Sequence, residues 1–318
     1  MLVQGAGGNV SWKKGDELWV KASGTWLADA NKKDIFVPID LKHLKAAIEN
    51  NDFYVTPKLL NNSALRPSIE TLLHALMPQR VILHVHAIEP LAYLVRSHPE
   101  YEISQKLKGA VSWKMVPYQK PGEKLARAVA RVCQDSPGIK VLLLQSHGLV
   151  IGGNDIAEVD HELRQIISLL SAPEIDVVTN AVLPDPIFID VDLIYNPVNN
   201  SEIQRLAQDT YLFDRIKTDW ALYPDHVVFL GHCPTCYDSI QMFEKDIEVG
   251  VRPELFFLKD RGVFVNNEFN LAKYAQLKCF YDVIVRQPRN ASLNTLSHQQ
   301  ISDLLNWDAE QYRQKMAK

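Results

Sequence analysis

Hydrophobic residues in the first half of the chain follow the two periods that mark strands and helices. Short β-rich runs predict strands at residues 18–21, 35–39, 81–86 and 140–146, and residues 148–152 either continue the last strand or turn back from it. Helical spacing predicts helices at residues 41–49, 68–77, 90–97, 123–134 and 156–170. Ser68 is the expected N-cap of the second helix, Pro78 ends it, and Asp155 caps the last.

The expected domain organisation follows from the length of the chain and from the position of its prolines. A chain of 318 residues is long for a single core and typical of two domains. Residues 172–187 carry several prolines and little periodicity, so we place a linker there. We therefore expect one domain at residues 1–178 and a second at residues 179–318. Near the C-terminus, Ser297 and Gln300 form a capping-box pattern that starts a helix running through Tyr312.

The second half of the sequence echoes the first. Residues 141–151 resemble residues 255–265, and an Asn-containing turn and a helix follow each stretch. Residues 80–84 likewise resemble residues 226–230. This suggests the hypothesis that the C-terminal α/β domain is a degenerate, metal-free repeat in which Arg261 stands in place of a histidine.

Composition narrows the class of protein. Hydrophobic residues make up 47% and charged residues 23%, as in globular proteins, and the formal net charge is -4. The slightly negative net charge and the lack of a run of Lys and Arg residues argue against a nucleic-acid partner. No stretch approaches the ~18 apolar residues of a membrane helix, and the first residues do not read as a signal peptide. Four cysteines make no disulfide framework, so we expect a cytoplasmic protein.

Three histidines are the candidate metal ligands. His84 and His86 are two apart on a predicted strand, so both rings project from one face. His147 ends another predicted strand just before Gly148. Three neutral imidazoles suit Zn²⁺ or a similar cation such as Co²⁺ or Mn²⁺, and they leave a coordination position for substrate. Each histidine taken alone is more often a half-buried structural residue.

A carboxylate and several small-residue loops accompany the histidines. Glu70 is expected in the first turn of the helix at 68–77, where a helix N-terminus stabilises an acid and where it can also serve as a general acid or base. The loops at residues 5–11 and 22–25 can present backbone N–H groups and hydroxyls to an anion. Lys21 and Arg66 lie near them as counter-charges or as solvated side chains. His74 shares a helix face with Glu70.

The order of these elements resembles a known family. G-G-N-x-S, S-G-T, P-S-x-E-x-x-x-H, H-x-H and S-H-G occur in that order within residues 5–172. This pattern resembles the class II aldolase/adducin family and is similar to that of fuculose- and rhamnulose-1-phosphate aldolases. The resemblance implies a three-layer α/β/α domain with a central, mainly antiparallel sheet.

The resemblance also implies roles for particular residues. It makes His84, His86 and His147 zinc ligands and Glu70 the catalytic carboxylate. It makes Tyr118 a proton donor that reaches a neighbouring subunit's site, and therefore implies a homo-oligomer. The implied binding loop for the substrate phosphate consists of Gly8, Asn9, Ser23, Gly24 and Ser68.

The activity implied is that of a metal-dependent aldolase, a lyase of carbohydrate metabolism. It would cleave or form a C–C bond in a ketose, expected to be a sugar phosphate, through a metal-stabilised enediolate. Ile69 departs from the family pattern because most relatives have a second serine there, which puts the phosphate in question. Three alternatives stay open: a sugar-phosphate dehydratase, an epimerase, and an adducin-like interaction protein without enzymatic activity.

Overall fold

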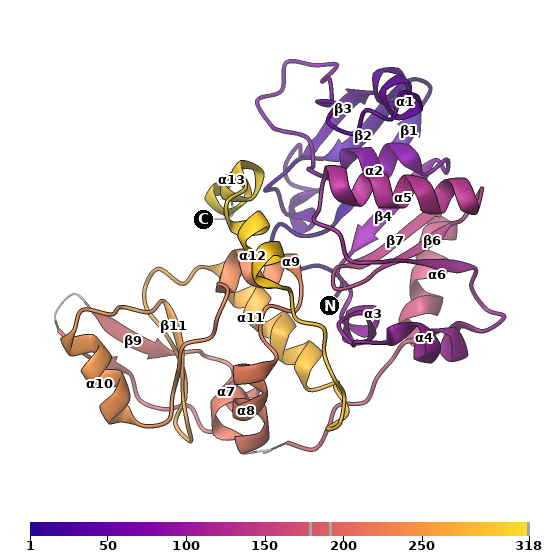
Figure 1. The fold of residues 1–318 in the computed structure, drawn as a ribbon. Helices are drawn as coiled ribbons and strands as arrows, with labels where there is room; N and C mark the ends of the chain where they lie inside the picture. The colour runs from indigo at the N-terminus through magenta and orange to yellow at the C-terminus, as the bar shows by residue number, and fades with distance from the viewer. Residues whose placement is uncertain (178–179, 191–192, 317–318) are drawn as a thin grey trace.

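A seven-stranded sheet forms the centre of the first half (Figure 1) in the computed structural model, which describes residues 1–177, 180–190 and 193–316. The strand order is β3-β2-β1-β4-β7-β6-β5, and every neighbouring pair is antiparallel except β5 and β6. The strands are β1 (Asn9–Lys14), β2 (Glu17–Lys21), β3 (Phe36–Asp40), β4 (Val81–Val85), β5 (Trp113–Val116), β6 (Val141–Leu144) and β7 (Gly148–Gly153). The expected mainly antiparallel sheet is confirmed.

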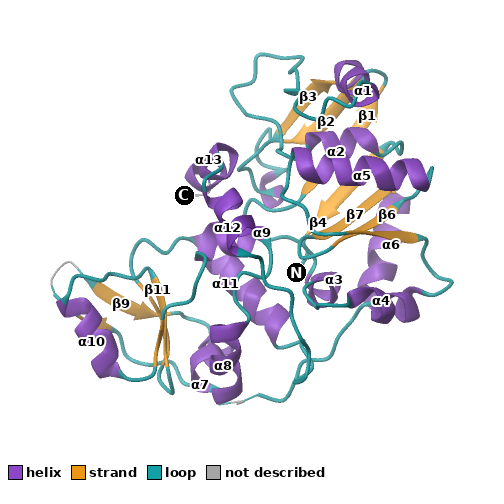
Figure 2. Cartoon of the chain, in the orientation of Figure 1, coloured by secondary structure: helices purple, strands orange, loops and turns teal. Residues whose placement is uncertain are grey.

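Helices cover both faces of this sheet and complete the three α/β/α layers (Figures 1 and 2). Strand residues alternate between the faces: Ile82 packs with the cluster that includes α2 and α5, whereas Val81 and Val85 pack with α3, α4 and α6. Besides the short 3-10 turn η1 (Leu27–Asp29), the helices are α1 (Leu41–Glu49), α2 (Thr71–Leu76), α3 (Ile88–Leu94), α4 (Pro99–Leu107), α5 (Glu123–Asp135) and α6 (Ile156–Leu169).

Several expected boundaries need correction. The helix predicted at residues 68–77 begins only at Thr71, so Ser68 is not its N-cap; the N-cap position belongs to Glu70. Residues 148–152 turn back as an antiparallel partner of β6. Asp155 caps α6 as predicted, because its side chain accepts a hydrogen bond from the backbone N–H of Glu158. Periodicity missed β1, α4 and β5.

A second, five-stranded sheet with the order β10-β11-β12-β9-β8 forms the C-terminal half. Its strands are β8 (Ile187–Phe188), β9 (Ile194–Pro197), β10 (Cys236–Tyr237), β11 (Leu255–Leu258) and β12 (Gly262–Val265). Its helices are α7 (Ser201–Gln208), α8 (Thr210–Thr218), α9 (Pro224–Leu230), α10 (Ile240–Glu248), α11 (Leu271–Ile284), α12 (His298–Leu305) and α13 (Asp308–Met316). The domain boundary predicted between residues 178 and 179 falls outside the described residues.

The second sheet repeats part of the first. Read from β8, its order β8-β9-β12-β11-β10 matches β1-β4-β7-β6-β5, and each pair has the same relative direction. The hairpins match in detail, since Ser146 and Asp260 occupy the same turn position, with φ of 49° and 58°. These matches support the hypothesis of a degenerate repeat. The predicted correspondence between residues 226–230 and residues 80–84 is wrong, because residues 226–230 lie in α9 whereas residues 81–84 lie in β4.

The counterpart of β4 is therefore β9, and α9 is an additional helix placed between the repeated elements. The two halves share a hydrophobic cluster in which Ile88 and Leu91 of α3 pack with residues of α9 and α11, Phe280 among them. The predicted capping box of Ser297 is present, but the last helix breaks into α12 and α13 near Trp307. Figure 1 shows these two helices between the sheets. No described helix has both the length and the apolar composition needed to cross a bilayer.

Candidate active site

Three imidazole rings meet at the end of the central strand β4. His84 lies on β4 and His86 just after it, so both rings point to the same side. His147 lies in the β6–β7 turn, directly after Ser146. One nitrogen from each ring lies within 4.8 Å of the other two, and all three residues are buried. The structure thus brings the three candidate ligands together.

Hydrogen bonds determine which nitrogen of two rings carries the proton. His84 Nδ1 lies 3.1 Å from the backbone oxygen of Leu149, which can only accept. His86 Nδ1 lies 3.2 Å from Oδ2 of Asp225, an acceptor when ionised. Neutral rings held this way both direct bare Nε2 lone pairs at each other, and the two Nε2 atoms are 3.1 Å apart. Facing lone pairs repel unless a cation lies between them, so this donor set fits a metal that binds imidazole.

Burial keeps the rings of His84 and His147 in the neutral form that binds metals. It lowers the pKa of His84, and it lowers the pKa of His147 to about 3. Both rings are therefore neutral near pH 7, as metal ligation requires.

Glu70 directs its carboxylate at the same nitrogens. Its Oε2 lies 3.3 Å from His84 Nε2, and its Oε1 lies 3.4 Å from His147 Nε2. Asn9 Nδ2 donates a hydrogen bond of 3.0 Å to Oε2. Burial acts to raise the pKa of Glu70, but the histidines outweigh it and hold the pKa at about 2. The Glu70 carboxylate is thus ionised at neutral pH, and it lies beside the point where the three histidine rings converge.

The residues expected to bind phosphate surround a small cavity next to the histidines. The cavity measures about 20 Å³, which is room for about one water molecule. Ser23 Oγ is buried there and has no hydrogen-bond partner among the described residues, whereas Ser68 Oγ accepts from the backbone N–H of Glu70. The site residues predicted from the sequence that line this cavity are Gly8, Asn9, Ser23, Gly24, Ser68, Glu70, His86 and His147.

Lys21 is a buried lysine that lines the same cavity. Its Nζ donates to the backbone oxygens of Ala6 and Thr25, at 3.1 and 2.7 Å. Burial lowers the pKa of Lys21 to about 7. It is therefore not the solvated side chain that one interpretation of the sequence allowed.

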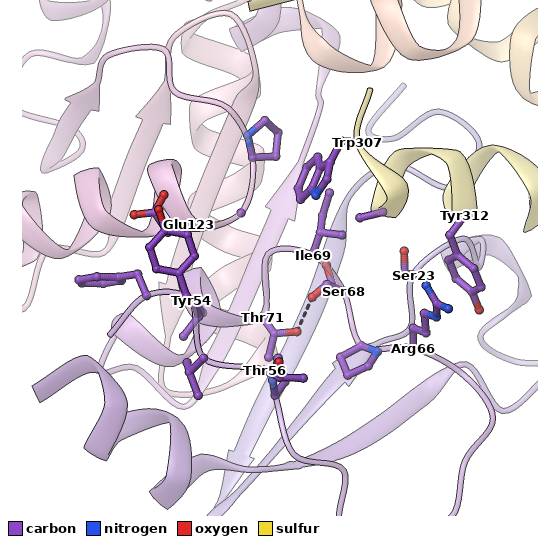
Figure 3. A pocket seen from close by; sticks show the side chains of 18 of the residues that line it. Ser23, Tyr54, Thr56, Arg66, Ser68, Ile69, Thr71, Glu123, Trp307 and Tyr312 are labelled. Carbon is purple, nitrogen blue, oxygen red and sulfur yellow. Dashed lines mark hydrogen bonds between the residues drawn. The ribbon is translucent and has the colours of Figure 1, made fainter. Parts of the chain in front are cut away.

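A larger cleft of about 850 Å³ adjoins the small cavity (Figure 3). Ser23, Ser68 and Ile69 line both spaces, so the cleft leads toward the histidines. Figure 3 shows Arg66 beside Tyr312 of α13, with 4.4 Å between the guanidinium carbon and the ring centroid. The wall of this cleft therefore includes both halves of the chain.

Two predicted residues lie elsewhere. The Tyr118 ring packs against the hydrophobic cluster of the C-terminal half, and its buried hydroxyl has no partner among the described residues. The side chain as a whole is half-buried, and its role as a proton donor at a neighbouring subunit's site stays a prediction. His74 faces Ser11, with 2.7 Å between Nδ1 and Oγ, and burial lowers its pKa to about 3.

Sequence analysis did not identify two residues that the C-terminal half places at the cavity. Asp225 of α9 contacts His86, and Arg313 of α13 pairs with both Asp225 and Glu310. Neither residue belongs to a recognisable motif. Only the packing of the halves reveals them.

Comparisons with known proteins each cover about half of the chain. The sequence pattern of the class II aldolase and adducin N-terminal domain matches residues 1–169. The uncharacterized oxidoreductase YuxG of Bacillus subtilis (strain 168) is 30% identical over 164 residues, which is 46% of this chain and 23% of that protein. The chain thus spans about a quarter of the length of this curated relative.

Solved structures similar to the chain include a class II aldolase domain and an L-fuculose 1-phosphate aldolase. The N-terminal class II aldolase domain of a conserved protein from Thermoplasma acidophilum is 29% identical, with a TM-score of 0.44 over 52% of this chain and 82% of that one. An L-fuculose 1-phosphate aldolase is 16% identical, with a TM-score of 0.38 over 52% of this chain and 74% of that one. By the match over residues 1–169, which is more than half of its length, the chain belongs to the class II aldolase and adducin family.

Proposed function

We propose that the protein is a metal-dependent aldolase that cleaves or forms a C–C bond in a ketose. The observation that carries this proposal is the approach of the Nε2 atoms of His84 and His86 to 3.1 Å, next to His147 and the Glu70 carboxylate. His84, His86 and His147 would hold one divalent cation, for which zinc is our first choice and cobalt or manganese the alternatives. When bound, that ion would act as a Lewis acid on the substrate carbonyl.

Glu70 is the proposed proton carrier. Its low pKa keeps it ionised, which is the form that removes a proton from the carbon next to a carbonyl in the synthetic direction. In cleavage Glu70 would first accept the proton of the substrate hydroxyl whose oxygen becomes the aldehyde, and it would then pass that proton to the carbon left by the broken C–C bond. Asn9 holds Oε2, which leaves Oε1 as the oxygen that can face substrate, and Oε1 is buried without a hydrogen-bond partner among the described residues.

The proposed substrate is a sugar bearing an anionic group, most simply a phosphate. Arg313 brings positive charge to the small cavity, Lys21 adds to it when protonated, and Ser23 offers a hydroxyl that has no partner among the described residues. Ile69 supplies no hydroxyl where most relatives have a serine, so the phosphate-binding loop has one contact fewer. The cavity of about 20 Å³ is too small for a sugar, so we place the body of the substrate in the adjoining cleft of about 850 Å³, which shares Ser23 and Ser68 with the cavity.

The test is a screen of ketose 1-phosphates with the metal-loaded protein, in which aldehyde release is coupled to oxidation of NADH. The proposal predicts aldehyde release that is lost in Glu70→Gln. Loss of water without aldehyde would favour the sugar-phosphate dehydratase, and conversion to a stereoisomer would favour the epimerase, both of which use a similar site. A metal-free, inactive protein would favour the adducin-like interaction protein. A homo-oligomer also belongs to the proposal, and light scattering tests it.

A further inference from the structure

Asp225 joins the additional helix of the C-terminal half to the histidine cluster. It lies in the first turn of α9 and is only 2% exposed. Its Oδ2 lies 3.2 Å from His86 Nδ1 and accepts a 3.3 Å hydrogen bond from Gln276 Nε2. Its Oδ1 accepts from Arg313 Nη2. Each of these three partners lies outside α9.

The charges around Asp225 keep it an acceptor. Arg313 Nη2 donates to Oδ1 and Gln276 Nε2 donates to Oδ2, so both oxygens of Asp225 accept hydrogen bonds and the guanidinium balances the charge of the carboxylate. An ionised carboxylate has no proton to donate, so the hydrogen between it and His86 must sit on Nδ1. The Nε2 atom of His86 is then free of a proton and faces His84.

Close packing makes this contact specific. A Cβ at Gly7 would lie 2.9 Å from Asp225 Oδ2 and 3.1 Å from His86 Nδ1, so only glycine fits against the pair without displacing it. The glycine-rich loop of the first half, the ring of His86 and the carboxylate from the second half are thus packed around one hydrogen bond.

We propose that Asp225 is a positioning residue of the metal site, which fixes the tautomer and orientation of His86 so that the C-terminal half completes a site whose ligands all lie in the first half. This inference rests on the proposed metal binding by the three histidines. It gives the C-terminal half a role in the chemistry, although that half carries none of the ligands. Carboxylate partners of metal-bound histidines typically change metal affinity by about 10–100-fold when removed.

The experiment compares Asp225→Asn with wild type and with Asp282→Asn. Asp282 is also a buried aspartate of the C-terminal half, paired with Lys278 on α11 and outside the histidine cluster. Affinity for Zn²⁺ is measured by competition with a chromophoric chelator, and the visible absorption bands of bound Co²⁺ report ligand geometry. We expect about 10–100-fold weaker Zn²⁺ binding and altered Co²⁺ bands in Asp225→Asn, and neither change in Asp282→Asn.

A second pair of variants separates positioning from folding. Gly7→Ala keeps every charged group but disturbs the contact between His86 and Asp225, so it should also weaken Zn²⁺ binding, whereas Asp225→Glu should restore part of the affinity lost in Asp225→Asn. Wild-type affinity and wild-type Co²⁺ bands in both Asp225→Asn and Gly7→Ala would overturn the inference. Wild type that binds no metal would instead overturn the proposed function itself.

Discussion

Replacing Arg313 by methionine tests how α13 is held on the rest of the molecule. The Arg313 side chain is buried, donates to Asp225 Oδ1, and lies 3.2 Å from Glu310 Oε1. Methionine keeps much of the volume but leaves the Asp225 carboxylate as a buried charge without its guanidinium. Breaking a buried ion pair on one side typically costs about 3–5 kcal/mol, whereas replacing both charges costs far less. We therefore expect Arg313→Met to lower the free energy of unfolding by about 3–5 kcal/mol.

A double-mutant cycle isolates the interaction. In the Asp225→Asn background the same Arg313→Met change should cost only about 1–2 kcal/mol, which gives a coupling energy of about 2–3 kcal/mol. The assay is urea unfolding followed by circular dichroism at pH 7 with EDTA, so that metal binding does not contribute. A cost below about 1 kcal/mol for Arg313→Met, or effects that add within about 0.5 kcal/mol, would refute the buried pairing.

Three further predictions concern other parts of the site. Burial raises the pKa of Glu310 to about 7 despite Arg313, so the folded state holds this proton more tightly than the unfolded state, and the associated stability is complete below about pH 4.5 and lost by about pH 7. Urea unfolding across that range should show the free energy of unfolding of Glu310→Gln rising by about 3 kcal/mol relative to that of wild type as pH rises. The same pH dependence of the free energy of unfolding in both proteins would contradict this. Gly148→Ala should abolish metal binding, measured by elemental analysis, because its Cβ would lie 2.6 Å from the backbone oxygen of Val85 and 3.0 Å from His86 Cδ2. Glu70→Gln should keep the metal but lower kcat by about 10²–10⁴-fold with an active ketose phosphate, and an unchanged kcat would exclude Glu70 as the proton carrier.

The histidine cluster is the part of the site that local sequence patterns could predict. The spacing of His84 and His86 on a strand fixes their shared face by the period of two, and His147 precedes a glycine where the strand must turn. Antiparallel pairing of β4 with β7 then brings these segments together, since His84 pairs with Val150.

Long-range packing is the part that could not be predicted. Residues 226–230 form a short apolar run whose periodicity suits a strand or a helix equally, and Pro224 at the first turn together with packing on α11 makes it a helix. Asp225 and Arg313 reach the site only through that helix and α13. No local pattern marks a residue whose role arises from contact between segments about 140 residues apart.

The central claim is that His84, His86 and His147 hold a metal ion beside Glu70. The most direct test is the metal content of the purified wild-type protein, measured by elemental analysis beside a His84→Ala/His86→Ala double variant. Our account predicts about one zinc or other divalent transition metal per chain in wild type and none in the folded double variant. Wild type that stays free of metal after incubation with Zn²⁺, Co²⁺ and Mn²⁺ would contradict it.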